Sequence, residues 1–171
     1  MKNFPDSMSE PWLRGSLRDI PAVQRAVLHA LELANEDLEH WCENLSDREL
    51  NAHPSGLPSV AFHLRHIARS MDRLLTYAEG QELSVGQLAA LNSEMEPNAT
   101  REELFTELRT ALAMSGERIR RFDAARLEEP RTVGKRQLPT TLGGLLVHVA
   151  DHTQRHVGQA ITTAKIMKAR E

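Results

Sequence analysis

The chain has 171 residues, enough for one domain with a sizeable core and short for two. Its net charge of −3 gives no electrostatic footprint for nucleic acid, and no stretch approaches the roughly 18 apolar residues of a membrane span. Cys42 is the only cysteine, which excludes an intrachain disulfide and zinc sites built on several cysteines, so we expect a buried core thiol. The N-terminus carries no apolar signal segment, and we expect a cytoplasmic protein without membrane or nucleic-acid partners.

Aromatic residues make up only 4% of the chain, so the core must consist mainly of Leu, Ala, Val and Met, which favours helices over sheets. Residues 1–15 combine prolines and a glycine with polar residues and are expected to form an irregular arm, leaving 16–171 as one domain. Apolar residues then recur every three or four positions up to Leu45. This pattern predicts a first helix of about 25 residues, with Asp19 as its cap and Pro21 in its first turn.

A second helix is predicted from Ser59 to Glu79, because its apolar residues share one face and Gly80 is well placed to end it. A connection of about twenty residues follows, which is long for a compact domain. Ser84 and Gln87 match a capping box and predict one short helix within this connection.

A second capping box, Thr100 with Glu103, opens a third helix that continues to about Phe122. The next segment, 125–139, is charged and rich in turn-forming residues. Within it, Thr132 to Leu138 is the one place with room for a short hairpin.

The fourth helix is predicted to begin at Thr140 or Thr141 and to continue to about Lys168. The connections between the four long helices are short, long and moderate in turn. These lengths favour an all-α four-helix bundle with a long crossover between the second and third helices.

Three histidines of the last helix, His148, His152 and His156, are spaced by four residues and therefore lie along one side of it. The outer two would be about 12 Å apart, whereas metal–nitrogen bonds are about 2 Å long, so only a neighbouring pair can bind one ion. The apolar stripe places His152 and His156 inward and leaves His148 as a bystander. An inward pair of this kind is equally compatible with core histidines that bond to the backbone or a carboxylate.

A third ligand would have to come from another helix, and the second helix offers His63 and His66. Helical-wheel geometry slightly favours His63, which lies nearer the apolar stripe. His29 and His40 are expected on helix surfaces, and His53 in a loop.

A basic run extends from the end of the third helix into the segment before the fourth helix, and it is interleaved with acidic residues. We expect it to form a solvated surface; the alternative is a lip that attracts an anionic substrate to a site at the end of the bundle. Its members are Arg118, Arg120, Arg121, Arg126, Arg131, Lys135 and Arg136.

Over residues 19–168 the chain resembles the DinB/YfiT-like family of bacterial four-helix metalloproteins. The resemblance is carried by His-Ile-Ala from His66, by His-Thr-Gln-Arg-His-Val-Gly-Gln from His152, and by Leu-Pro-Thr-Thr-Leu-Gly from Leu138. It implies a down-up-up-down bundle and a tendency to form homodimers. It also implies one divalent metal ion, nickel or zinc, held by His66, His152 and His156. The wheel preference for His63 leaves that residue as the alternative, since a site at a bundle's end can lie off the main stripe.

The resemblance also implies a reaction class, because characterised members of that family include thiol-dependent transferases and an isomerase that use low-molecular-weight bacterial thiols. The first hypothesis is therefore an enzyme in which a three-histidine metal activates a thiol toward a small-molecule substrate. The same metal could instead activate water for hydrolysis. A third possibility is a non-catalytic binding or interaction module, in which the metal only clamps two helices together.

Overall fold

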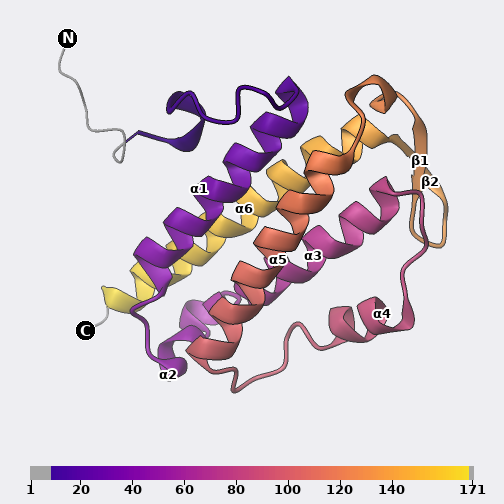
Figure 1. Cartoon of the computed structure of the whole chain (residues 1–171). Helices are drawn as coiled ribbons and strands as arrows, with labels where there is room; N and C mark the ends of the chain where they lie inside the picture. The colour runs from indigo at the N-terminus through magenta and orange to yellow at the C-terminus, as the bar shows by residue number, and fades with distance from the viewer. Residues whose placement is uncertain (1–8, 170–171) are drawn as a thin grey trace, which may run out of the picture.

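The computed structural model describes residues 9–169, which form six α-helices and one small antiparallel hairpin (Figure 1). The four long helices are α1 (Ala22–Cys42), α3 (Val60–Ala78), α5 (Arg101–Arg121) and α6 (Leu142–Lys168). The connections contain the short helices α2 (Asp47–Leu50) and α4 (Val85–Asn92) and the strands β1 (Pro130–Val133) and β2 (Leu138–Thr141). The hairpin includes the predicted segment Thr132 to Leu138 and extends beyond it at both ends, and the remainder confirms a mainly helical fold.

The four long helices form a down-up-up-down bundle with the long crossover between α3 and α5 (Figure 1). Near the start of α1, the side chain of Gln24 donates to the carbonyl of Phe122 just beyond the end of α5, so these two helices are antiparallel. Near the other end of α1, the ammonium group of Lys165 on α6 lies 4.1 Å from the ring centroid of Trp41, so α1 and α6 are parallel. The two parallel helices α3 and α5 need the crossover to bring the chain back to the same end.

Side-chain caps determine where the later helices begin. The hydroxyls of Ser59, Ser84, Thr100 and Thr141 each accept a hydrogen bond from the backbone amide three residues further along. Such a cap is worth about 1 kcal/mol because it satisfies an amide that has no partner within the helix. The capping boxes predicted at Ser84 and Thr100 are both confirmed.

The first helix begins later than predicted, at Ala22 with Pro21 in the capping position, and the expected cap at Asp19 is wrong. The amide of Ile20 bonds to the carbonyl of Leu17, which closes a turn immediately before the helix. Asp19 lies inside that turn, so its carboxylate cannot take the capping position. The helix has 21 residues rather than about 25.

Part of the predicted arm, residues 1–8, lies outside the described residues. In the remainder, Pro11–Leu13 form a turn of 3-10 helix, and the guanidinium of Arg14 bonds to carboxylates of α1. His29 on α1 is buried, and its Nε2 lies 3.1 Å from the hydroxyl of Ser16, which follows the arm. The expectation that His29 is a surface residue is therefore wrong, because the chain preceding α1 covers that face.

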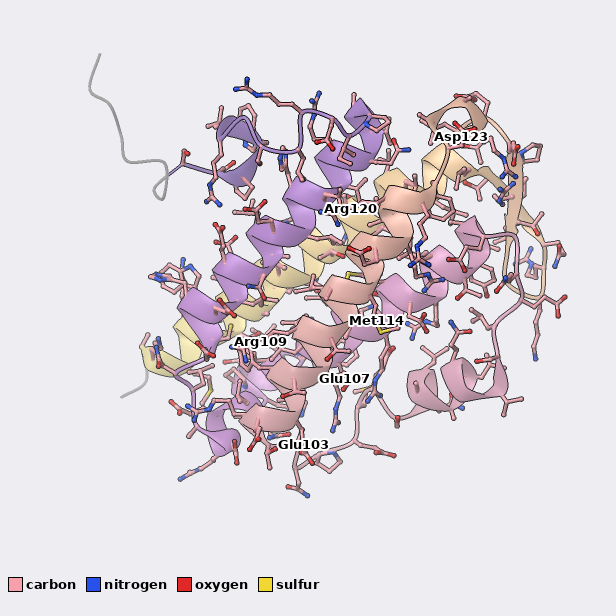
Figure 2. The ribbon with its side chains drawn as sticks, viewed as in Figure 1. Glu103, Glu107, Arg109, Met114, Arg120 and Asp123 are labelled. Atoms are coloured by element: carbon pink, nitrogen blue, oxygen red, sulfur yellow. The ribbon has the colours of Figure 1, made fainter. Side chains whose placement is uncertain are left out.

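Aliphatic side chains from all four long helices form the core, as the scarcity of aromatics predicts. Cys42 is fully buried within it, as predicted, and burial raises the pKa of its thiol to about 12. The outer face of α5 is charged instead, with Glu103, Arg109 and Arg120 exposed to solvent (Figure 2). Among residues 9–169, no helix combines the length and the apolar character needed to cross a bilayer.

Candidate metal centre

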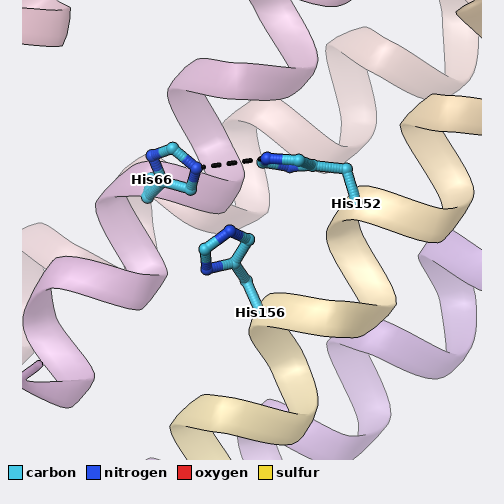
Figure 3. Close-up of side chains that lie close together, drawn as sticks. All are labelled: His66, His152 and His156. Carbon is cyan, nitrogen blue, oxygen red and sulfur yellow. Dashed lines mark hydrogen bonds between the residues drawn. The ribbon is translucent and has the colours of Figure 1, made fainter. Parts of the chain in front are cut away.

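Three histidines from two antiparallel helices converge in the structure: His66 on α3 and His152 and His156 on α6 (Figure 3). One ring nitrogen from each lies within 4.8 Å of the others. The Nε2 atoms of His66 and His152 are 3.3 Å apart. Both histidines of α6 lie in the middle of that helix rather than at its end.

The chemistry and spacing of these donors fit a divalent transition metal. Zinc–nitrogen bonds of about 2.0–2.1 Å in a tetrahedral arrangement place two ligand nitrogens about 3.4 Å apart, close to the distance between His66 and His152. The ring nitrogen of His156 lies within 4.8 Å of the other two. Imidazole nitrogens suit zinc and nickel alike. All three side chains are half-buried, and among the described residues no fourth His, Cys, Asp or Glu joins the group. A bound ion would therefore keep a position open to an exogenous ligand.

Glu94, at the end of the crossover, fixes the orientation of His66. Its Oε2 lies 2.7 Å from Nδ1 of His66 and its Oε1 lies 2.6 Å from the guanidinium of Arg73. Burial alone would raise the pKa of this carboxyl, but the bonds from His66 and Arg73 outweigh it and hold the pKa below its usual range. The ionised carboxylate thus accepts the Nδ1–H of His66 and leaves the Nε2 lone pair free to ligate a metal.

The two histidines of α6 are also held through their second ring nitrogens. The Nδ1 of His152 lies 3.4 Å from the hydroxyl of Ser70. The Nδ1 of His156 lies 3.1 Å from Nδ1 of His63, so the other ring nitrogen of His156 faces the remaining pair (Figure 3). Outer partners of this kind orient metal-binding imidazoles and fix their tautomers.

His63, the alternative ligand suggested by the helical wheel, lies outside the group of three. It is buried behind His156 and contacts it by Nδ1, whereas His66 contributes to the cluster. The structure thus brings together the set implied by the family resemblance. That these residues ligate a metal ion stays a prediction.

Burial keeps the imidazoles of His63, His152 and His156 neutral at neutral pH, and the neutral form is the one that ligates metals. Burial, with the neighbouring imidazoles adding to it, lowers the pKa of His63, His152 and His156 to about 4. At neutral pH a metal ion would therefore displace almost no protons from His152 and His156.

The remaining histidines lie outside the group, although the ring of His148 packs edge-on against His152 with a centroid separation of 5.4 Å. His148 is exposed, and its Nδ1 lies 3.6 Å from the carboxylate of Asp151. His40 and His53 are exposed as well, the latter in the connection before α3. The ring of Phe62, which the sequence did not single out, stacks on His66 with a centroid separation of 5.3 Å.

The basic run does not border the histidines. Arg118 pairs with Asp72 and Glu79 near the far end of α3. Arg126 and Arg131 both bond to the carboxylate of Glu129. Carboxylates thus neutralise several of its members, which supports the solvated surface over the anion-attracting lip.

The chain matches a family model and shares its fold with solved structures. A family model described as the DinB superfamily matches residues 30–160, more than half of the chain. A crystal structure of a conserved protein from Enterococcus faecalis is similar with a TM-score of 0.71 and 19% sequence identity, and the match covers 87% of this chain and 99% of that one. At this identity the likeness shows a shared fold alone. No curated protein matches the chain.

Proposed function

This chain belongs to the DinB superfamily, and from that premise we propose that it is a metal-dependent enzyme using zinc or nickel. The observation that carries the proposal is the convergence of His66, His152 and His156 with an outer partner for each ring. A site that served only to clamp helices would be expected to close its fourth position with a protein ligand. The described residues offer no such ligand beside the three histidines.

The reaction that we propose is thiol-dependent group transfer to a small-molecule electrophile, with a low-molecular-weight bacterial thiol as cosubstrate. A metal bound by three imidazoles would lower the pKa of a thiol that occupies its open position. The resemblance to thiol-using transferases supports this choice over hydrolysis.

The surroundings of the site supply a second reason for preferring a thiol. Glu94 is already engaged by His66 and Arg73, and His63 lies behind His156, so neither is free to take a proton from water. A thiol is more acidic than water by several pKa units and needs less help from the protein to ionise. The roles of this chain's own residues are to bind and orient the ion and, by burial, to keep His152 and His156 neutral.

The test is a screen of metal-loaded protein, purified without a polyhistidine tag, against several bacterial thiols and a generic aromatic electrophile. We expect thiol-dependent turnover that disappears in His152→Ala and persists in the matched control His148→Ala. Hydrolysis of ester or amide substrates without any thiol-dependent reaction would assign the metal to water activation. If the protein binds one metal ion per chain but shows neither activity, the proposal of an enzyme fails and a non-catalytic metal-binding module is the remaining hypothesis.

A further inference from the structure

The crossover between α3 and α5 is attached to the bundle almost entirely by polar contacts. Within residues 79–98, all of which the structure describes, Glu94 is the only buried residue. The apolar side chains of α4, among them Val85 and Leu88, face solvent instead. This segment therefore lacks the hydrophobic anchor that normally holds a long connection in place.

Three arginines of α3 replace that anchor. Arg65, Arg69 and Arg73 are spaced by four residues, so they follow one side of the helix. Arg65 donates to the carbonyl of Glu96, and Arg69 donates to the carbonyl of Ala90 and the hydroxyl of Ser93. Arg73, the last of the three, donates to the carboxylate of Glu94.

Glu94 is thus the point at which the crossover meets the metal centre. One carboxylate oxygen accepts from Arg73 and the other from Nδ1 of His66, and the side chain is 5% exposed. We propose that Glu94 is a positioning residue for the metal site, and that docking of the crossover and binding of the metal are coupled through it. This inference rests on the proposed function, because it requires that His66 ligates a metal ion.

The coupling follows from the hydrogen bond itself. When the crossover undocks, His66 loses the acceptor that holds its Nδ1 proton and the orientation of its ring. Loss of such an outer partner typically weakens metal binding by about 10–100-fold. Since linkage is reciprocal, the metal must favour the docked crossover by the same factor.

The experiment compares the native protein with Glu94→Gln, which is nearly isosteric but removes the charge, and with the matched control Glu96→Gln. Glu96 is an exposed neighbour whose contact with α3 is made by its backbone carbonyl, so its substitution leaves the arginine row intact. Zinc affinity is measured by competition with a chromophoric chelator. Hydrogen exchange of the amides of residues 84–98 is measured with and without zinc, and the absorption spectrum of the cobalt-loaded protein reports on coordination.

We expect zinc to slow exchange in the crossover of the native protein and of Glu96→Gln at least tenfold. In Glu94→Gln we expect affinity to fall about 10–100-fold, the protection by zinc to disappear and the cobalt spectrum to change. Arg73→Gln is a second variant in case the first does not fold. It keeps the bond from Glu94 to His66 but loosens the crossover, so it should weaken zinc binding in the same direction.

Two results would overturn the coupling alone: native zinc affinity in Glu94→Gln, or a crossover whose exchange zinc does not change in the native protein. Glu94 would then serve only as a partner for Arg73. If the native protein binds no metal, the proposed function fails and the coupling fails with it, so the two failures are distinguishable.

Discussion

Metal binding should stabilise the fold, because its ligands come from distant parts of the chain. His66 and His152 are separated by 86 residues, and only folding brings their Nε2 atoms to 3.3 Å. Closing an unfolded loop of that length costs about 4 kcal/mol from (3/2)RT ln n alone. The unfolded chain therefore binds the ion much more weakly than the native protein does.

The size of the stabilisation follows from mass action. At a free metal concentration one hundred times Kd, RT ln(1 + [L]/Kd) amounts to about 2.7 kcal/mol. For a chain of this length, each kcal/mol of added stability raises Tm by about 2–4 °C. We therefore expect the Tm of the zinc-loaded protein to exceed that of the chelator-treated protein by about 5–10 °C. Differential scanning calorimetry at fixed protein concentration measures this shift.

The variant His66→Ala should bring the shift close to zero. It leaves only His152 and His156, which are four residues apart and available to the unfolded chain as well. The matched control, His148→Ala, should retain the full shift because that side chain lies outside the group. A native-sized shift in His66→Ala, or its loss in His148→Ala, would refute the reasoning.

Three further outcomes are expected from the burial and the pKa values. First, the metal-free protein should lose stability as the pH falls from about 6.5 to 4, because His63, His152 and His156 have pKa values of about 4 when folded and near 6.5 when unfolded. Urea unfolding midpoints that stay constant between pH 6.5 and 4 would contradict the expected loss of stability. Second, the Cys42 thiol, with a pKa of about 12, should resist iodoacetamide at pH 8 until the protein unfolds, and its contribution to stability should be lost only as the pH rises from about 8.5 toward 12. Rapid alkylation of the native protein would show that the thiol is accessible. Third, Leu64→Ala should cost about 2–5 kcal/mol in the free energy of unfolding, since Leu64 is fully buried, and a loss below 1 kcal/mol in urea titrations would argue against the packed core.

Local sequence signals determined much of this fold. The hydroxyls at Ser59, Ser84, Thr100 and Thr141 cap their helices through contacts only three residues away, so their positions can be read from the chain. The start of α1 was harder to predict from the sequence, because a turn ahead of the helix removes Asp19 from the capping position. Such a turn has no periodic signature in the sequence.

The candidate site was predictable only in part, for a related reason. The four-residue spacing of His152 and His156 is a property of one helix and identifies that pair directly. The choice of His66 over His63 depends on how α3 faces α6, which a helical wheel does not give. Glu94 could not be predicted at all, because it reaches His66 from an irregular segment through tertiary packing. The burial of His29 was missed for the same reason.

The central claim is that one divalent ion is bound by three histidines, and metal stoichiometry tests it most directly. Protein purified without a polyhistidine tag, loaded with zinc and dialysed, should contain one ion per chain by elemental analysis. The double variant His152→Ala/His156→Ala should contain none, while His148→Ala should match the native protein. An unchanged metal content in the double variant would contradict the site, and with it the function that we propose.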